Sequence, residues 1–374
     1  CIRDRVYTGR FLSKLRSSID NKNIIVSSFR EEWAILNGNV KSIKKPSPVL
    51  KVRGNNVTFK NFEITPINLK TRDKRDPNFV QFDGVSHETG RNCQFLNLII
   101  HGNNGLGFGT WKKTGGTIIS NCLVFNNGYI GDKGKGFGEG FYVQNDSDDE
   151  IRILKDNIIF SNYYKGIEVW SASKKAKREW VKNVTLENNV IFNSGLPSKY
   201  KTVDNIIIGT DDRNGINIAK NITVKNNILY HNTNFLKNEV NGDAASLTVG
   251  FHKNAPVENV KIKDNVIIGR NNALRILYAK TLTFRNNVVY SGYIHTTRSI
   301  LDNLNPSVWK FGDNTFYTKN STPFIILKEK KYTSKNWEEK FRVNYNSSFK
   351  HIKNFNLDEV LDITKNEYKP NEYR

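Results

Sequence analysis

Apolar and polar positions alternate along the chain in eight similar segments. Each segment starts with a short alternating run, passes through an Asn or Asp, and continues into a second run rich in β-branched residues. The alternation predicts a half-buried strand, the polar residue predicts a bend, and the second run predicts another strand. Repeats at intervals of about 22 to 40 residues are typical of solenoids. The copies are VTFKNFEI (57–64), CQFLNLII (93–100), TIISNCLV (117–124), IRILKDNIIF (151–160), VTLENNVIF (184–192), ITVKNNILY (222–230), VKIKDNVII (260–268) and LTFRNNVVY (282–290).

The polar residue at the bend indicates which solenoid the chain forms. Asn or Asp occupies this step in every copy, and from the fourth copy onward the following residue is also Asn. Stacked coils would place these amides roughly 4.8 Å apart, where each can hydrogen-bond to the next as a buried ladder. The LxxLxL frame of leucine-rich repeats is missing, so we predict an all-β fold, a right-handed parallel β-helix. The predicted ladder residues are Asn157, Asn189, Asn227, Asn265 and Asn287.

The repeats cover most of the 374 residues, so one elongated domain is predicted rather than two globular ones. Residues 1–48 are predicted to form an N-terminal cap and first coil, and residues 49–318 the parallel β-helix. Beyond residue 318 the pattern decays. Residues 319–374 are therefore predicted to form a C-terminal cap or tail that shields the last coil from edge-to-edge association.

A further strand lies between successive ladder segments, and its copies align from VQFDG (80–84) to LRILYA (274–279). Side chains alternate in and out along a strand, so inward residues such as Phe141 and Ile167 leave neighbouring columns facing solvent. The predicted outward columns carry aromatic, amide and carboxylate side chains, which suit stacking on and hydrogen bonding to sugar rings. They read Gln81, Gly109, Tyr142, Glu168, Ile207, Thr248 and Arg275, and then Asp83, Trp111, Gln144, Trp170, Gly209, Gly250 and Leu277.

The charge balance indicates a polyanionic partner. Lys and Arg number 57 against 36 Asp and Glu, a formal net charge of +21. No basic helix, zinc-finger spacing or RNA-binding aromatic motif is present, so nucleic acid is not expected and an acidic polysaccharide is favoured. A basic solvent face without any partner is the alternative interpretation. No run approaches the roughly 18 apolar residues of a membrane span, so no transmembrane segment is predicted.

Two well-matched neighbouring strands, EGFYVQN (139–145) and KGIEVWS (165–171), predict a candidate site. The glycine-rich stretch GDKGKGFG (131–138) leads into the first of them. Stacked in register, they bring together titratable groups and an aromatic wall, as general acid–base chemistry requires. The alternative is a surface ion pair beside a rim aromatic. The expected neighbours are Glu139 with Lys165, Tyr142 with Glu168, Gln144 with Trp170, and Asn145 with Ser171.

The segments NCQFLNLIIHGNNGLGFG and NCLVFNNG, followed by GEGFYVQN, resemble the right-handed parallel β-helix proteins of the pectate lyase superfamily. The likeness is greatest to a bacterial polysaccharide-active group whose corresponding segment reads Gly-His-Gly-Ile-Tyr-x-Gln-Asn. It covers about residues 33–318. It implies the fold rather than one activity, because lyases, hydrolases, epimerases and non-catalytic proteins share the coil. Glu139 stands where that group carries His, which puts His-based proton transfer there in doubt.

Eliminative cleavage of a uronate-containing or sulfated polysaccharide is the favoured activity. A lyase needs a base for the C5 proton, an acid for the leaving oxygen, and donors that neutralise the uronate carboxylate. The base is expected to be Tyr142, Lys165 or His252, and Gln144, Asn145 and Arg275 are expected to engage the carboxylate. The full set of catalytic candidates is Tyr142, Lys165, Glu139, Glu168 and His252, and that of substrate-binding candidates is Asp83, Trp111, Gln144, Asn145, Trp170, Arg213, Lys253 and Arg275.

The resemblance also implies Ca²⁺ as a cofactor, because the superfamily often uses it. Asp146, Asp148 and Asp149 follow the strand directly and offer oxygen ligands. A solvated turn is the alternative interpretation of this acidic run.

Two other classes of function stay open. An inverting glycoside hydrolase would use carboxylates from the set Asp83, Glu139, Glu168, Asp211 and Asp243, with carboxyls roughly 6.5–9.5 Å apart. A non-catalytic adhesin or glycan-binding protein would present the same aromatic surface without chemistry. In each case we expect a secreted, periplasmic or cell-surface monomer.

Overall fold

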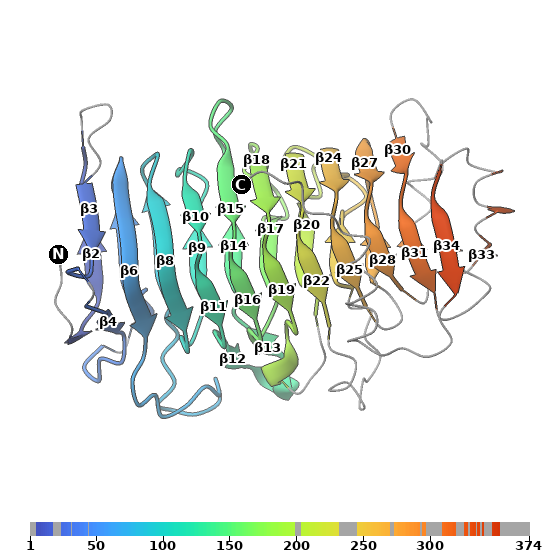
Figure 1. Cartoon of the computed structure of the whole chain (residues 1–374). Coiled ribbons are helices and arrows are strands. Elements are labelled where there is room, and N and C mark those ends of the chain that lie inside the picture. Colours follow the sequence, from blue (N-terminus) through green and yellow to red (C-terminus); the bar gives the residue numbers. More distant parts are fainter. Residues whose placement is uncertain are drawn as a thin grey trace.

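The chain winds into a solenoid whose strands stack side by side along one axis, from the N-terminal strands at one end to the C-terminal strands at the other (Figure 1). The structure is a computed structural model. It describes residues 5–17, 24–30, 32–43, 45–198, 203–231, 245–269, 273–291, 294–296, 309–318, 325–327, 330–333, 335–336, 339 and 346–351.

Two long sheets make up the coil. We call them the ladder sheet, which contains the repeated segments, and the site sheet, which contains the strands between them. The site sheet consists of β2 (Phe11–Ser13), β5 (Leu50–Arg53), β7 (Val85–Thr89), β9 (Phe108–Thr110), β14 (Phe141–Val143), β17 (Ile167–Ser171), β20 (Ile206–Thr210), β23 (Leu247–Val249), β26 (Leu274–Ile276), β29 (Ile294–Thr296), β32 (Ile325–Leu327) and β33 (Lys330–Tyr332).

The ladder sheet takes two short strands, or one longer strand, from each coil. It consists of β1 (Val6–Thr8), β3 (Ile24–Ser27), β4 (Ala34–Asn37), β6 (Val57–Thr65), β8 (Gln94–His101), β10 (Ile118–Ser120), β11 (Leu123–Phe125), β15 (Arg152–Lys155), β16 (Ile158–Phe160), β18 (Lys182–Glu187), β19 (Val190–Phe192), β21 (Lys220–Lys225), β22 (Ile228–Tyr230), β24 (Glu258–Lys263), β25 (Val266–Ile268), β27 (Leu282–Arg285), β28 (Val288–Tyr290), β30 (Trp309–Gly312), β31 (Thr315–Thr318) and β34 (Ser348–His351).

Strand pairing within both sheets is parallel from coil to coil, and the antiparallel pair β32–β33 comes last in the site sheet. A small separate hairpin of β12 (Tyr129–Ile130) and β13 (Gly136–Phe137) projects from one coil. The predicted right-handed parallel β-helix is confirmed. The reason is visible in the sequence, because each apolar run is too short to form a core alone and is buried only when coils stack.

The polar step of each repeat is a bend, as predicted. Asn and Asp at this step have φ between 51° and 60°, a left-handed conformation that these residues tolerate better than most. The following Asn is buried and forms the predicted ladder. From Asn157 to Asn287, the Nδ2 of each ladder residue donates to the Oδ1 of the next at 2.9 to 3.0 Å.

The ladder continues into a ninth copy that the sequence pattern did not reveal. Asn287 donates from Nδ2 to the Oδ1 of Asn314 at 3.1 Å. Asn314 belongs to WKFGDNTFY (309–317), in which Gly312 takes the polar position that Arg285 holds in the preceding copy. The shared Asp-Asn step was the signal that could have identified this copy.

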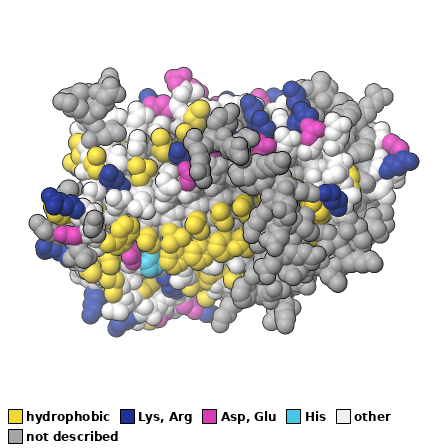
Figure 2. Space-filling model, viewed as in Figure 1, with side chains coloured by type: hydrophobic (Ala, Val, Ile, Leu, Met, Phe, Trp, Pro, Cys, Tyr) yellow, Lys and Arg dark blue, Asp and Glu magenta, His cyan; other side chains and the backbone are white. Residues whose placement is uncertain are grey.

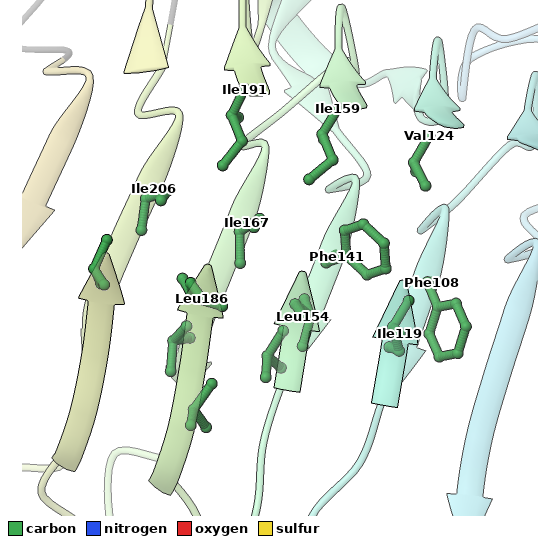
Figure 3. Close-up of a cluster of buried hydrophobic side chains, with 14 of the residues drawn as sticks. Phe108, Ile119, Val124, Phe141, Leu154, Ile159, Ile167, Leu186, Ile191 and Ile206 are labelled. Atoms are coloured by element: carbon green, nitrogen blue, oxygen red, sulfur yellow. The ribbon is translucent and has the colours of Figure 1, made fainter. Parts of the chain in front are cut away.

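The core lies between the two sheets. Figure 3 shows side chains of the site sheet meeting those of the ladder sheet in the interior of the coil. Each such side chain is fully buried, and burial of a Leu, Ile or Phe side chain stabilises a fold by roughly 1.5–3 kcal/mol. They include Phe108, Phe141, Ile167 and Ile206 from the site sheet, and Ile119, Leu154, Leu186, Val124, Ile159 and Ile191 from the ladder sheet.

The strand predicted at VQFDG (80–84) lies a few residues further along the chain, at β7 (Val85–Thr89). β7 begins at Val85, because Val85 and His87 are the alternating residues that point into the core. Ser86 therefore pairs with Gly109, and Gln81 does not join that column. Phe82 is buried in the loop before the strand, which explains its apolar character without a strand.

Aromatic rings also stack on the outer face of the ladder sheet. Their centroids are 4.6 to 4.9 Å apart and their planes differ by 6° or less. Figure 2 shows the hydrophobic band that runs over β11, β16, β19 and β22. Because the ring faces cover one another, this band offers only ring edges and cannot stack on sugars. Its rings belong to His101, Phe125, Phe160, Phe192 and Tyr230.

Strands before residue 49 already pair with both sheets, since β1 pairs with β4 and β2 with β5. The division into a cap at 1–48, a β-helix at 49–318 and a tail at 319–374 stays a prediction, and most of the tail lies outside the described residues. In the described part of the chain, no helix has the length and apolar character needed to cross a membrane.

Candidate active site

Two columns of residues run across the site sheet from coil to coil. The entry column lies two residues before each strand, and backbone hydrogen bonds keep its members in line. The N–H of Gly107 donates to the carbonyl of Glu139 at 2.8 Å, and the N–H of Gly140 donates to that of Lys165 at 3.0 Å. The strand column is the second residue of each strand. The entry column reads Asp83, Leu106, Glu139, Lys165, Asp204 and Ala245, and the strand column reads Ser86, Gly109, Tyr142, Glu168, Ile207, Thr248 and Arg275.

A buried carboxyl pair lies where the two columns meet. Glu139 and Glu168 hydrogen-bond to each other, and Lys165 forms an ion pair with Glu168. The three side chains are only 4 to 9% exposed. The register of Tyr142 with Glu168 is confirmed. The predicted neighbours Glu139 and Lys165 do lie on adjacent coils of the entry column. The alternative of a surface ion pair between them is wrong, because Lys165 pairs with Glu168 of its own coil and the whole cluster is buried.

Burial determines the protonation of this cluster. Burial, and then the charge of Glu168, raise the pKa of Glu139 well above its usual range. Burial alone would lower the pKa of Lys165, but the charge of Glu168 and the phenol of Tyr164 outweigh it, and the pKa is raised. Burial and the two carboxyls also raise the pKa of Tyr142. These shifts favour the protonated forms of all three groups, so neither Lys165 nor Tyr142 is a ready base.

Asp204 continues the charged cluster into the next coil, and the sequence reasoning missed it. Its Oδ1 accepts hydrogen bonds from the hydroxyl of Thr248 at 2.7 Å and the N–H of Ala245 at 3.1 Å. Its Oδ2 lies 3.7 Å from the guanidinium of Arg275. Arg275, predicted to bind a substrate carboxylate, thus lies beside a protein carboxylate. The signal for Asp204 was its place two residues before a strand, which it shares with Glu139 and Lys165.

Asp83 occupies the other end of the entry column. Its Oδ1 accepts the backbone N–H of Leu106 at 2.8 Å, and burial raises the pKa of Asp83 to about 6. It lines a cavity of about 290 Å³ together with Ser86, Glu88 and Trp111. Asp83 is thus a carboxylate that gains and loses its proton close to neutral pH, in contact with open space.

Trp111 forms an aromatic platform between the coil of Asp83 and the coil of Glu139. Its indole N–H donates to the Oγ of Ser86 at 2.8 Å, and its ring lies 5.4 Å from that of Tyr142 at an angle of 40°. Gly109 makes room for it, since a Cβ at this position would lie 3.2 Å from the indole. One hydrogen bond therefore fixes the indole ring, and the absence of a side chain at Gly109 leaves the space that the ring occupies.

Trp170 is a wall of the cluster rather than an exposed stacking surface. It is 7% exposed, its ring meets Phe251 edge-on at 4.7 Å, and the Nζ of Lys165 lies 5.3 Å from its centroid. Gln144 donates from Nε2 to the carbonyl of Trp170 at 3.2 Å, and also hydrogen-bonds to Tyr142. The predicted sugar-stacking role of Trp170 is corrected, because Phe251 and the cluster cover its ring.

Asn145 does not face the candidate site, contrary to the prediction. It is fully buried, and its Nδ2 donates to the carbonyls of Glu150 at 2.9 Å and Asn183 at 3.2 Å. Its Oδ1 accepts the N–H of Ser147 at 3.2 Å. Its burial agrees with the alternation of β14, because Asn145 shares the inward parity of Phe141 and Val143.

The acidic run after β14 does not fit a calcium site. Asp148 forms an ion pair with Lys182, which lowers the pKa of Asp148, and Asp146 lines a cavity that also contains Arg91 and Lys113. Throughout the described ranges, no three His, Cys, Asp or Glu side chains converge to hold a metal ion. Ca²⁺ needs roughly six to eight oxygen ligands, but the predicted carboxylates have basic side chains beside them instead of further oxygens. The predicted set was Asp146, Asp148 and Asp149.

His252, Arg213 and Lys253 lie in the turns that follow β20 and β23. The Nδ1 of His252 accepts the N–H of Asn254 at 3.3 Å, and the Nδ2 of Asn254 donates to the carbonyl of Arg213 at 2.7 Å. The entry column precedes the strands, so these turns are at the opposite end of each strand from Glu139 and Lys165. The structure thus separates His252 from the proton-transfer groups with which it was predicted to act.

An aromatic group beside the entry column was not predicted. Tyr129 and Phe137 of the β12–β13 hairpin stack at 5.3 Å, with Phe79 on one side at 4.9 Å and Tyr164 on the other at 6.5 Å. Burial raises the pKa of Tyr129, and the charges of Glu139 and Asp83 add to the effect. The glycine-rich stretch before Glu139 was its only signal in the sequence.

No family model and no curated protein matches the chain. Solved structures do resemble it. They include alginate lyase from Paenibacillus sp. str. FPU-7, with 15% identity, a TM-score of 0.51, and coverage of 93% of this chain and 90% of that one. The Azotobacter vinelandii mannuronan C-5 epimerase AlgE6 A-module has 10% identity, a TM-score of 0.52, and coverage of 93% and 89%.

The GH136 lacto-N-biosidase from Eubacterium ramulus is also similar, with 12% identity, a TM-score of 0.59, and coverage of 94% of this chain and 61% of that one. At these identities the likeness shows the fold alone. The fold expected from the resemblance to the pectate lyase superfamily is thereby confirmed, and the activity has to be argued from the side chains.

Proposed function

We propose that the protein is a carbohydrate-active enzyme that hydrolyses glycosidic bonds in an acidic polysaccharide. The observation that carries this proposal is the contrast between two carboxyls of the entry column. Burial and the neighbouring charge of Glu168 raise the pKa of Glu139 well above its usual range, and burial raises that of Asp83 to about 6. Two carboxyls whose environments separate their pKa values are the usual acid and base of glycoside hydrolysis.

The backbone positions of the two carboxyls are spaced close to the upper limit for inversion. Leu106 lies between Asp83 and Glu139 in the entry column, so the two residues are two coils apart, roughly 9 to 10 Å along the axis. Inverting hydrolases keep their carboxyls roughly 6.5–9.5 Å apart, so that a water molecule fits beside the sugar. Glu139 then protonates the leaving oxygen, and Asp83 removes a proton from the attacking water.

Neighbouring groups support these roles. Lys165 neutralises Glu168, and the hydrogen bond between Glu168 and Glu139 holds the acid in place. Trp111 lies between acid and base, where its face can stack on the sugar whose bond is cut. This arrangement places the platform and the proton-transfer groups on consecutive coils.

The polymer is proposed to be anionic. The net charge of +21 attracts polyanions at long range, and two of the similar structures carry the names of proteins that act on alginate and mannuronan. A secreted, periplasmic or cell-surface monomer fits such a substrate, and these remain proposals. No nucleic-acid partner is proposed.

β-Elimination, favoured from the sequence, has less support from the geometry. Its base would be Tyr142 or Lys165. Burial and the nearby carboxyls raise the pKa of Tyr142, and the charge of Glu168 raises that of Lys165 in spite of burial, so both groups hold their protons. The two reactions leave different products. Hydrolysis yields a saturated new end, whereas elimination yields an unsaturated uronate that absorbs in the ultraviolet.

The test is incubation with alginate, polygalacturonate, hyaluronan and chondroitin sulfate, with neutral cellulose oligomers for comparison. We expect new reducing ends from an acidic polymer, no ultraviolet absorbance, and inversion of the anomeric centre by NMR. Glu139→Gln and Asp83→Asn should each lower kcat by roughly 10²–10⁴-fold. Glu187→Gln, which removes a carboxylate from the ladder sheet, is the matched control and should retain full activity.

Other outcomes would each redirect the proposal. Reducing ends accompanied by ultraviolet absorbance would establish elimination. Binding of a polymer without any product would favour the glycan-binding alternative. Hydrolysis with retention of configuration would reject the pairing of Glu139 with Asp83, because a retaining pair is only about 5–5.5 Å apart.

A further inference from the structure

A second cavity lies on the N-terminal side of the candidate site. Its volume is about 550 Å³, which falls in the range of pockets that hold small ligands, roughly 300–1,000 Å³. It is enclosed by residues 37–43 after β4, residues 67–71 after β6, and residues 78–82 before β7. These segments all lead from the ladder sheet to the site sheet.

The guanidinium of Arg10 faces this cavity without a protein anion. Its Nε and one terminal nitrogen are buried and have no hydrogen-bond partner among the described residues. It lies 4.2 Å from the centroid of Phe82, which supports it from one side as a cation–π contact. Gly38 leaves space for it, because a Cβ there would lie 2.7 Å from the same terminal nitrogen. Burial lowers the pKa of Arg10 to about 10, so it remains charged at neutral pH.

The rest of the lining is cationic, amide and apolar. Lys41 and Lys70 add positive charge, and none of the described lining residues is Asp or Glu. Asn104 is fully buried and its Oδ1 has no partner among the described residues. A ligand that satisfies both Arg10 and Asn104 must carry an anionic group and a hydroxyl or other donor.

The walls of the cavity are held in place before any ligand arrives. Asn104 donates from Nδ2 to the carbonyl of Thr71 at 3.0 Å, and Asn39 donates to that of Ile67 at 2.7 Å. The N–H of Ile67 in turn donates to the Oδ1 of Asn37 at 2.8 Å. Preorganised walls of this kind reduce the entropy lost when a ligand binds.

Phe82 connects this cavity to the candidate site. It lines the Arg10 cavity, and it also lines the cavity of about 290 Å³ that contains Asp83 and Trp111. The two cavities therefore adjoin at the side chain of Phe82, which is a wall of both.

We propose that the Arg10 cavity is a subsite for one hexuronate residue, whose carboxylate pairs with Arg10 and whose hydroxyl donates to Asn104. A planar guanidinium matches a carboxylate with two parallel hydrogen bonds, and Phe82 with the aliphatic lining covers the apolar face of the sugar. The subsite rests on the proposed function for the identity of the polymer, and it deepens that function by assigning the substrate's charge to a specific side chain.

The experiment is calorimetric titration of the full chain carrying Glu139→Gln with galacturonate, glucuronate and mannuronate. At least one hexuronate is expected to bind, and its uncharged methyl ester and the neutral parent sugar should bind about 10- to 100-fold more weakly. Inorganic sulfate should bind more weakly than the hexuronate, since it cannot contact Asn104 and the apolar lining together. The ester comparison uses one folded protein and does not depend on any change to Arg10.

Arg10→Gln should abolish the preference for the acid over its ester, with Arg5→Gln as the control of equal charge at an exposed position. Equal binding of acid and ester, sulfate as tight as the hexuronate, or an unchanged preference in a folded Arg10→Gln protein would overturn the subsite. Failure to bind any hexuronate while the native chain hydrolyses an acidic polymer would overturn the subsite alone. Hexuronate binding without hydrolysis would overturn only the proposed reaction.

Discussion

Replacement of one ladder residue should reveal how much of the coil's stability depends on buried amides. Asn227 is fully buried, and its Oδ1 accepts both the backbone N–H and the Nδ2 of Asn189, each at 2.9 Å. Its own Nδ2 donates to the Oδ1 of Asn265 at 3.0 Å and to the carbonyl of Leu186 at 3.0 Å. Asn227→Ala therefore leaves the N–H of Asn189 without an acceptor inside the coil.

The magnitude follows from these contacts. Each buried polar group that loses its partner costs roughly 1–3 kcal/mol. The Nδ2 of Asn189 keeps its bond to the carbonyl of Leu154, so the backbone N–H of Asn189 and the carbonyl of Leu186 bear most of the loss. We expect Asn227→Ala to lower the free energy of unfolding by about 3–5 kcal/mol.

The neighbouring residue supplies a matched control. Asn226 is at the bend, with φ of 55°, and Asn226→Ala removes the same atoms. Placing Ala in a left-handed conformation costs about 1–2 kcal/mol. Urea unfolding followed by circular dichroism measures both variants, and hydrogen exchange reports the amide of Asn189 directly. Equal destabilisation by the two variants, or a loss below about 1 kcal/mol for Asn227→Ala, would refute the argument that the ladder amides are essential.

Three further predictions concern the site and its surroundings. Trp111→Ala should raise KM roughly tenfold with a smaller change in kcat, and Trp111→Phe should restore much of the loss, as initial rates on an acidic polymer would measure. Activity should rise with pH through about 6, because Asp83 must lose its proton to act as the base. It should fall again at higher pH, where Glu139 loses the proton that it needs as the acid. A pH profile without the rise near 6 would exclude Asp83 as the base. Burial, and then the charge of Arg152, lower the pKa of His87 from 6.5 to about 3. Between these two values the unfolded chain binds a proton that the folded chain does not. The free energy of unfolding should therefore fall by up to about 1.4 kcal/mol for each pH unit below about 6.5. His87→Leu should remove that part of the pH dependence in urea unfolding, and an unchanged slope would contradict it.

The sequence predicted the fold well because the fold is made of local repeats. The polar step followed by Asn recurs at intervals of 22 to 38 residues from Asn157 to Asn287, so the same pattern predicted the bend at Asn226, the buried amide of Asn227 and the stacking of coils. The ninth copy around Asn314 was missed although Trp309 and Phe311 align with the apolar residues of the eighth copy. Register between EGFYVQN and KGIEVWS was predictable because one coil follows directly on the other.

The sequence predicted which residues of the site lie near one another, but not which of them interact. Alternation identified which residues share a column, so Tyr142, Glu168 and Trp111 were found from sequence. It could not identify the partner of Lys165, because a long flexible side chain reaches carboxylates in its own coil and in adjacent ones.

Tertiary structure alone decided burial, and burial decided the chemistry. The contact of Phe79 with Tyr129, that of Phe251 with Trp170, and the hydrogen bond of Asn145 to Asn183 all join segments distant in sequence. Burial raises the pKa of Glu139 and favours its acid form. Arg10 and Phe82 likewise become a pocket only because two long turns close over them. The sequence by itself thus determined the coil and the order of residues on its surface. The exposure and the pKa of those residues depend on which turns cover them. No local sequence pattern contains this information, because the turns come from distant parts of the chain.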